Sequence, residues 1–165
     1  MWSHLDPILL GFRSCFSREA SFHWFVVIVC GFIVRLDHLG ISSFTRWLFM
    51  EPALYTSMVH FFRATSWRLE PLLEHWVTTV LRFYPLVEFN GRSLLIGDGT
   101  KACKEATKMP AVKSLHQDSE NNGKPEFIRG HHFGVVGVLA GHAKKTLCLP
   151  LEARLHEGIS NIQRS

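Results

Sequence analysis

The sequence predicts an α+β fold, in which a helical region is followed by a small set of β-strands. Up to about residue 88, apolar side chains recur at helical spacing and follow helix-opening signals. Beyond residue 93, apolar residues form short runs bounded by glycines, or alternate with polar residues. Asn90-Gly91, a turn signal, separates the two patterns. We therefore expect a helical region over residues 1–88 and a strand-rich region over residues 89–165.

Length and composition place the chain among globular proteins with a mild positive charge. Its 165 residues are 47% hydrophobic, which is enough for a real core. Lys and Arg number 18 against 14 Asp and Glu, so the net charge is +4 and the isoelectric point is near 9.0. Histidines, 10 in all, add positive charge below about pH 6.5. This balance is compatible with a nucleic-acid partner but does not require one.

The cysteines and the N-terminus indicate a reducing compartment. Cys15, Cys30, Cys103 and Cys148 are widely spaced and form no C-x-x-C pair. The N-terminus has Asp6-Pro7 early and no basic segment before an apolar core, so we do not expect a targeting segment. The expectation is a cytoplasmic protein with reduced thiols.

One apolar stretch, residues 22–34, has two interpretations. Apart from His23 and Gly31 it is apolar throughout. As a helix it is roughly 20 Å long, whereas the hydrocarbon core of a bilayer is about 30 Å thick. We expect a buried helix at the centre of the helical region, with no stable membrane insertion. A membrane-associated segment remains the alternative.

The other helices are predicted from their start signals. Ser42 or Ser43 is placed to cap a short helix. Glu51-Pro52 and Glu70-Pro71 each open a helix with proline at the first helical position. The expected helices therefore cover residues 6–16, 20–36 and 44–50, and then run from Glu51 and from Glu70.

The segment after the Asn90-Gly91 turn carries the most informative carboxylate. Three aliphatic residues, ending at Ile96, run into Asp98, which has a glycine on each side. This pattern predicts a short buried strand that carries Asp98 out of its C-terminal end, where an acid on rigid backbone can bind a metal ion. A plain hairpin turn at Asp98-Gly99 is the alternative, but the polar residues from Thr100 onward do not form a second alternating strand.

A long basic loop and a β-hairpin are expected after this strand. Residues 100–130 are polar, and four lysines lie in their first half. Residues 132–140 predict one strand and residues 146–154 a second, in which Pro150 favours a sheet edge or a bulge. The lysines can contact phosphates or belong to a solvated loop; they are Lys101, Lys104, Lys108 and Lys113.

Two further patterns have a functional and a structural interpretation. His131 and His132 are neighbours on an expected strand, so they point to opposite faces and cannot easily share a metal ion. We expect one to be buried and hydrogen-bonded and the other to point outward. Residues 40–46 could form the turn and recognition helix of a helix-turn-helix, but a plain helical hairpin is favoured. If the motif is real, the residues that face the DNA groove are Ser42, Ser43 and Arg46.

Three runs in the second region carry a resemblance to a known family. They are Asp98-Gly99-Thr100-Lys101-x-x-Lys104-Glu105, Met109-Pro110-x-Val112-Lys113-Ser114-Leu115-His116-Gln117, and Gly130-His131-His132-Phe133-Gly134. Together they resemble DDE-type insertion-sequence transposases, whose catalytic core has an RNase H-like fold. The upstream run Phe61-Phe62-Arg63-x-x-x-Trp67, with Trp76 further on, resembles the helical region that precedes that core.

This resemblance implies DNA transposition by two-metal phosphoryl transfer. Two Mg²⁺ or Mn²⁺ ions held by three carboxylates would promote attack on a DNA phosphodiester. Asp98 takes the position of the first metal-binding, catalytic carboxylate. Because the four lysines lie beside the strand that carries this acid, we favour DNA-binding roles for them. Arg46 is the DNA-binding candidate of the possible helix-turn-helix. The implied partners are double-stranded DNA at transposon ends and further transposase subunits.

The sequence departs from the family after the third expected strand. The second Asp and the Glu should lie on a later strand and helix, but the sequence stops at Ser165. A lone carboxylate cannot hold two divalent ions, because Mg²⁺ needs several ligands. We therefore expect an N-terminal fragment of a transposase, inactive alone, with an incomplete RNase H-like sheet. The acids in no matching context are Glu105, Asp118, Glu120, Glu126, Glu152 and Glu157.

Two other hypotheses stay open at this point. The chain could be a non-catalytic DNA-binding or regulatory module, marked by salt-sensitive duplex binding that survives loss of Asp98. It could also be a small membrane-associated protein built on residues 22–34.

Overall fold

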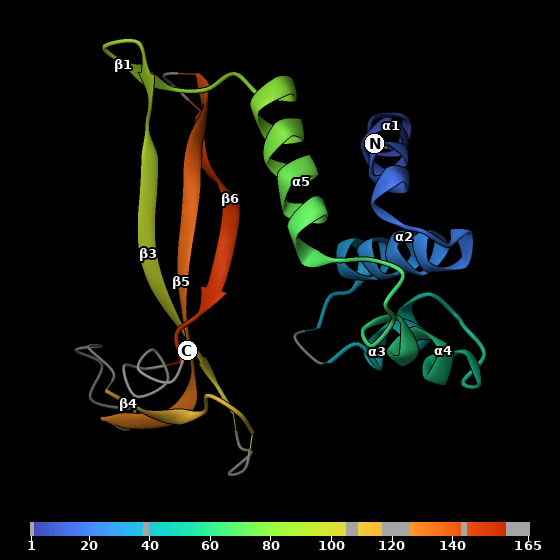
Figure 1. The fold of residues 1–165 in the computed structure, drawn as a ribbon. Coiled ribbons are helices and arrows are strands. Elements are labelled where there is room, and N and C mark those ends of the chain that lie inside the picture. Colours follow the sequence, from blue (N-terminus) through green and yellow to red (C-terminus); the bar gives the residue numbers. More distant parts are fainter. Residues whose placement is uncertain (1, 38–39, 105–108, 117–125, 143–144, 158–165) are drawn as a thin grey trace. The chain divides into compact units, whose positions relative to one another are not determined.

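The computed structural model describes residues 2–37, 40–104, 109–116, 126–142 and 145–157. It confirms the predicted α+β fold, since the helices precede the strands along the chain (Figure 1). The chain divides into two compact units, residues 1–79 and 80–165, and the boundary lies within the last helix. We call them the helical unit and the sheet unit.

The helices lie close to the predicted positions, but neither proline occupies the first helical position. Helix α4 begins after Pro52, and α5 begins before Pro71. Helix α1 extends further toward the N-terminus than expected, and a short 3₁₀ helix, η1, follows it. The bounds are α1 Trp2–Gly11, η1 Phe12–Cys15, α2 Glu19–Val34, α3 Ser43–Trp47, α4 Leu54–Phe61 and α5 Leu69–Phe83.

Phe32 and Ile33 of α2 are 52% and 44% exposed, so the prediction of a buried helix is confirmed only in part. Helix α2 nevertheless lies at the centre of the helical unit. It packs against η1, α3 and α4. Gly31 lets α3 approach closely, because a Cβ at this position would lie 2.7 Å from Cγ of the Phe44 ring. Phe44 and Met58 are fully buried. The core cluster consists of Phe12, Phe16, Phe22, Ile28, Phe44, Met58 and Phe61.

An aromatic turn between α4 and α5 closes this core. The Trp67 ring stacks on Phe61 with centroids 5.0 Å apart and an angle of 13° between the planes. The indole N–H also donates to the carbonyl of Phe61 at 2.9 Å. Ser17 donates its backbone N–H to Ser66 O at 2.9 Å, so the turn is tied to the residues before α2.

Neither serine caps α3, so that prediction is wrong. Ser42 already has helical backbone angles (φ −59°, ψ −23°) and its hydroxyl makes no capping hydrogen bond. An N-cap residue normally has an extended backbone, which aims its side chain at the free N–H groups. The Ser43 hydroxyl is buried and has no hydrogen-bond partner among the described residues.

The sheet unit contains a two-residue-loop hairpin and a four-stranded sheet. Strands β1 Glu88–Phe89 and β2 Arg92–Ser93 flank Asn90 and Gly91, whose φ angles are 51° and 72°. This left-handed backbone confirms the turn that the sequence predicts. The sheet consists of β3 Leu95–Cys103, β4 Lys113–His116, β5 Phe127–His142 and β6 Lys145–Leu155.

Strand β5 is the central strand of this antiparallel sheet. Gly130 pairs with Cys103 of β3 and with Lys113 of β4, so β3 lies on one side of β5 and β4 on the other. Strand β6 pairs with residues 133–142 of β5, beyond the part that pairs with β4. The register shifts between Val136 and Gly137, opposite Pro150, which confirms the predicted bulge.

Two predictions about the segment 94–130 are wrong. The β3 strand does not end at Asp98, because Thr100 to Cys103 continue the pairing with β5. Its apolar residues are also not buried, since Leu95 is 64% exposed. The expected loop of residues 100–130 contains the end of β3, strand β4 and the start of β5.

Candidate nucleic-acid interface

Asp98 lies in the middle of β3 rather than at its end. It pairs with Val135 of β5 and is exposed. Its Oδ1 accepts a hydrogen bond from the backbone N–H of Gly99 at 2.7 Å. The carboxylate is therefore held by a local contact on an open strand.

The register places Asp98 and Lys101 on opposite faces of the sheet. Side chains alternate along a strand, and residues paired across antiparallel strands share a face. Asp98 and Thr100 share one face with Phe133. Lys101 shares the other with His132. The structure therefore does not bring the Asp98 carboxylate and the nearest predicted DNA-binding lysine to the same surface.

Basic side chains gather on the face that carries Lys101. His132 lies in the middle of this group, and its ring centroid is 5.6 Å from that of His156, which follows β6. Lys113 Nζ lies 3.0 Å from His156 Nδ1 and donates to His156 O at 3.2 Å. Arg154 pairs across with Gly134, which places it on this face too. We call this surface the basic face, formed by Lys101, Lys113, His132, Arg154 and His156.

Hydrogen bonds hold the cations of the basic face in place. Lys101 Nζ donates to the carbonyl of His116 at 2.6 Å. The Arg154 guanidinium pairs with the Glu152 carboxylate, and this hydrogen bond raises the pKa of Arg154 above its usual range. Lys113 and His132 are half-buried, whereas Lys101 and His156 are exposed. The face therefore presents a fixed set of donors to solvent.

Of the two other lysines predicted to bind DNA, the structure describes Lys104, which lies outside the basic face. The backbone N–H of Lys104 donates to Arg129 O at 2.9 Å, and its side chain is exposed. Lys108 lies outside the described residues. So do three acids that the sequence offered as candidates, Glu105, Asp118 and Glu120.

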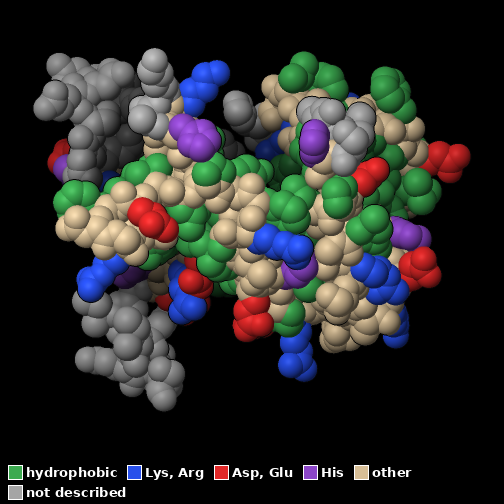
Figure 2. Space-filling view, turned by 90° about the horizontal axis from the view of Figure 1, so that it is seen from above, with side chains coloured by type: hydrophobic (Ala, Val, Ile, Leu, Met, Phe, Trp, Pro, Cys, Tyr) green, Lys and Arg blue, Asp and Glu red, His purple; other side chains and the backbone are tan. Residues whose placement is uncertain are grey.

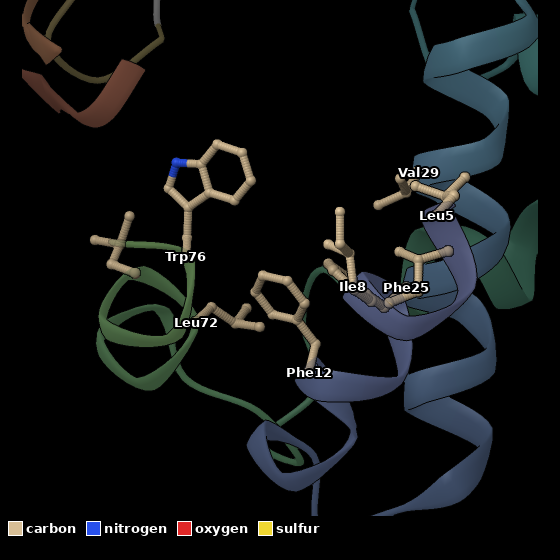
Figure 3. A pocket seen from close by; sticks show the side chains of 9 residues that line it. Leu5, Ile8, Phe12, Phe25, Val29, Leu72 and Trp76 are labelled. Carbon is tan, nitrogen blue, oxygen red and sulfur yellow. The ribbon is translucent and has the colours of Figure 1, made fainter. Parts of the chain in front are cut away.

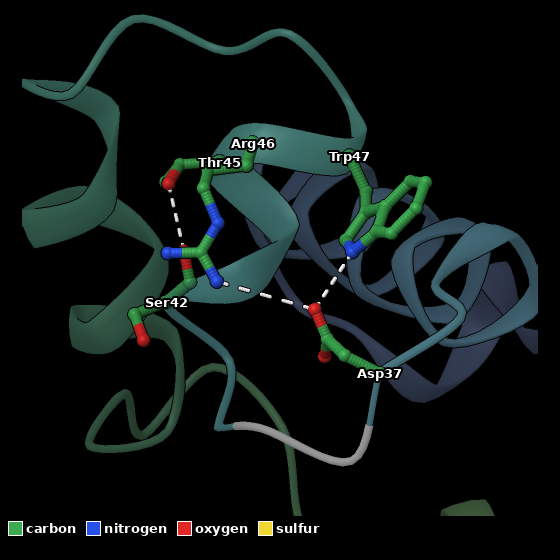
Figure 4. A network of polar contacts seen from close by, with 5 residues as sticks. All are labelled: Asp37, Ser42, Thr45, Arg46 and Trp47. Carbon is green, nitrogen blue, oxygen red and sulfur yellow. Dashed lines mark hydrogen bonds and ion pairs between the residues drawn. The ribbon is translucent and has the colours of Figure 1, made fainter.

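Arg46 belongs to a separate polar network in the helical unit (Figure 4). Asp37 Oδ2 accepts a hydrogen bond from Trp47 Nε1 at 2.8 Å and lies 4.0 Å from Arg46 Nη2. The Thr45 hydroxyl donates to Ser42 O at 2.7 Å. Ser43 is fully buried and cannot face a DNA groove, so the residue set expected for a helix-turn-helix is wrong at this position.

The adjacent histidines behave as expected for neighbours on a strand. His131 is 8% exposed, and its Nε2 is hydrogen-bonded to the carbonyl of Pro110 at 2.9 Å. His132 points to the opposite, basic face. The prediction of one buried, hydrogen-bonded histidine is confirmed. The partnership of His132 with His156 was missed, because the register that joins them depends on the β6 bulge.

The described residues do not fit a two-metal site. Among them, no three His, Cys, Asp or Glu side chains come together in a group that could hold a metal ion. Asp98 is a single carboxylate already bonded to its own backbone neighbour. Mg²⁺ and Mn²⁺ require several oxygen ligands, so we derive no metal-dependent step from these residues.

The helical unit also contains an apolar cavity of about 320 Å³ (Figure 3). Side chains of α1, η1, α2 and α5 line it, and Trp76 and Phe12 face each other across it. The lining residues are Leu5, Ile8, Leu9, Phe12, Phe25, Val29, Leu72, Leu73 and Trp76. No hydrogen-bonding group among them could orient a polar ligand, apart from the Trp76 indole.

Helix α2 is the longest helix among the described residues, and it is too short to cross a bilayer. None of the helices in this part of the chain is both long enough and apolar enough to do so.

Comparison of the chain with known protein families, with curated proteins and with solved structures finds no match.

Proposed function

We propose that this chain is a DNA-binding part of a DDE-type insertion-sequence transposase. The observation that carries the proposal is the strand order of the sheet unit. Strands β3, β5 and β6 form an antiparallel meander, and Asp98 lies on the first of them. The RNase H-like core of that family begins with three such strands, and the first bears the first metal-binding Asp.

The basic face supports double-stranded DNA as the partner. Lysine and arginine side chains that neutralise phosphates release condensed counterions, which favours binding at low salt. Lys101, Lys113 and Arg154 supply fixed positive charge there, within a chain whose net charge is +4. Such a partner accords with a cytoplasmic location, and the cysteines of the described residues are free thiols.

Catalysis in this proposal belongs to the complete transposase. Among the described residues, no second and third ligand join Asp98 to form a group that could hold a metal ion. The chain alone is therefore expected to bind DNA without cutting or joining it. Transposition would need the Mg²⁺ or Mn²⁺ ligands of the family's later strand and helix.

The proposal is tested by the DNA that follows codon 165. Translation in all three forward frames should reveal a strand that ends in Asp and a later helix that carries Glu. Their presence in any frame makes Asp98 the first ligand of a broken or frameshifted transposase. Their absence from all frames overturns the catalytic part of the proposal.

A second candidate function is a non-catalytic DNA-binding or regulatory module. The observation that favours it is the separation of Asp98 from the basic face by the alternation of β3. DNA binding then does not depend on the carboxylate. An excess of this chain would also inhibit a complete transposase, because it would occupy the DNA sites or the subunit interfaces that the complete enzyme needs. Unchanged transposition in the presence of excess chain would contradict this role.

A further inference from the structure

We propose that the basic face is a pH-dependent docking surface for the sugar-phosphate backbone of duplex DNA, with His132 and His156 as its proton-sensitive members. This inference rests on the proposed DNA-binding function. It adds which face of the sheet meets the duplex, and which side chains regulate that contact.

The side chains of the basic face form a row across β5, from β3 on one side to β4 and β6 on the other. His132 leans over β3, because a Cβ on Gly99 would lie 2.6 Å from its Nε2. On its other side the ring approaches His156, and His156 contacts Lys113. With strands about 4.8 Å apart, the row spans about 10 Å. The phosphates of one DNA strand rise 3.4 Å each along the helix axis, so a row parallel to that axis corresponds to about three phosphates.

The contact between Lys113 and His156 depends on the protonation state of the His156 imidazole. A lysine ammonium group has donors only, so His156 Nδ1 must be unprotonated to accept its hydrogen bond at 3.0 Å. When Nδ1 takes up a proton, this acceptor is lost and two positive charges face each other. Phosphate oxygens placed between them would accept from both groups. Proton uptake and phosphate binding therefore favour each other.

The other cations on this face strengthen the same effect, whereas the one acid among its described neighbours opposes it. Lys101 of β3 pairs directly with His132, and Arg154 of β6 lies beside it in the register. Glu152 of β6 is the acid that the register places on this face, and its carboxylate pairs with Arg154. Cys103 of β3 lies at the Lys113 end of the row. A protonated His132 thus has cationic neighbours, and an anionic ligand removes their mutual repulsion.

The test is the binding of the full chain to an end-labelled DNA duplex, followed by fluorescence anisotropy. Affinity is measured from 50 to 200 mM salt, once at pH 7.5 and once at pH 5.5. Each added phosphate contact makes the log–log salt slope steeper by about 0.9. Proton uptake by imidazoles that contact phosphate should therefore steepen the slope at pH 5.5, by at most about 1.8 for the two.

Matched variants separate this face from the other histidines. The double variant His132→Gln/His156→Gln should lose the difference between the two pH values. The control His23→Gln/His60→Gln alters two exposed histidines of the helical unit and should keep it. Lys113→Gln should weaken binding at both pH values, and Lys113→Arg should restore it. Restoration by arginine shows that positive charge at this position is what binding requires, and circular dichroism of Lys113→Gln checks that this variant folds.

The outcomes distinguish the two levels of the proposal. Duplex binding that is unaffected by Lys113→Gln and by the His132/His156 pair overturns the assignment of this face, and leaves the proposed function standing. Displacement of the duplex by an equal phosphate concentration of inorganic phosphate would show a general anion site and overturn the duplex assignment. No binding at either pH in 50 mM salt overturns the proposed DNA-binding function itself.

Discussion

In the helical unit, buried apolar side chains from η1, α2, α3 and α4 meet in one core cluster, whereas few apolar side chains are buried in the described sheet unit. Both units also carry large apolar side chains that are exposed. Phe44 and Met58 are fully buried in the first. Leu95 and Leu147 of the second are 64% and 51% exposed. Figure 2 shows hydrophobic side chains at the surface on the face in view. Each unit is therefore held together in its own way.

Side-chain packing stabilises the helical unit, whereas strand pairing stabilises the sheet unit. Among the described residues of the sheet unit, the buried apolar side chains are few and come from α5, β4 and β5. Backbone hydrogen bonds of the β3–β5 and β5–β6 ladders connect the rest. A sheet built in this way leaves a face open for a partner.

The largest expected effect follows removal of the most buried aromatic side chain. Phe44→Ala leaves a cavity at the α2–α3 contact and should lower the free energy of unfolding by about 3–5 kcal/mol. Urea unfolding followed by tryptophan fluorescence measures this directly, because all 5 tryptophans lie before residue 80. Leu36→Ala, at a position 83% exposed, is the control and should change stability by less than about 0.5 kcal/mol. Equal losses in both variants would refute a packed core at Phe44.

Two glycines sharpen the comparison because the same substitution should act in opposite directions. Gly31→Ala brings a methyl group to 2.7 Å from the Phe44 ring and should destabilise the helical unit by about 1–3 kcal/mol. Gly97→Ala in β3 meets no atom within 4 Å and should stabilise the sheet unit by about 0.5 kcal/mol. Differential hydrogen exchange in each unit measures the two effects.

The glycine prediction has an internal check. Phe44→Leu makes room for the added methyl group, so Gly31→Ala/Phe44→Leu should lose less stability than the sum of the single variants. If the changes in the free energy of unfolding were strictly additive, residue 31 and the Phe44 ring would not interact.

A smaller effect distinguishes two buried serines of the helical unit. The Ser43 hydroxyl has no hydrogen-bond partner in the described structure, whereas Ser66 Oγ lies 2.6 Å from Ser21 Oγ. Ser43→Ala removes an unsatisfied buried group and should stabilise by up to about 1 kcal/mol. Ser66→Ala should destabilise by about 1 kcal/mol. Thermal unfolding compares the two, and destabilisation by both would show that Ser43 is hydrogen-bonded.

The reactivity of the four cysteine thiols compares the two units without any mutation. Burial raises the pKa of the Cys15 thiol, against a smaller opposing effect of its hydrogen bond to Ser14. Burial and the Asp6 carboxylate raise the pKa of the Cys30 thiol. Cys103 and Cys148 of the sheet unit are exposed.

Alkylation of the native chain with iodoacetamide at pH 8 should therefore modify the sheet-unit thiols first. The Cys15 and Cys30 rates should rise further as pH increases, because a raised pKa delays formation of the reactive thiolate. Mass spectrometry of the digested protein gives the order of modification. One common rate for all four thiols would contradict the buried positions of Cys15 and Cys30.

The sequence predicts what depends on local pattern and local backbone geometry. The apolar stretch of α2, the left-handed turn at Asn90-Gly91 and the bulge at Pro150 each follow from a few neighbouring residues. The burial of one of the two adjacent histidines, which is His131, follows from strand alternation. Such features do not require knowledge of distant segments.

Features that depend on pairing between distant segments could not be predicted. Polar residues Thr100 to Cys103 form a strand because β5 supplies their hydrogen-bond partners, and Lys113 to His116 join it for the same reason. The basic face requires residues 101, 113, 132 and 156 to meet through this register. The lysines could be identified from sequence alone, but their separation from Asp98 could not.

The most direct test of the central claim compares duplex binding by the wild-type chain with binding by Asp98→Asn across a salt series. The claim is that the basic face, and not the Asp98 face, holds DNA. It predicts that both proteins bind in 50 mM salt, and that affinity falls with added salt along the same slope. Binding that is absent in 50 mM salt, or that disappears in Asp98→Asn, would contradict it.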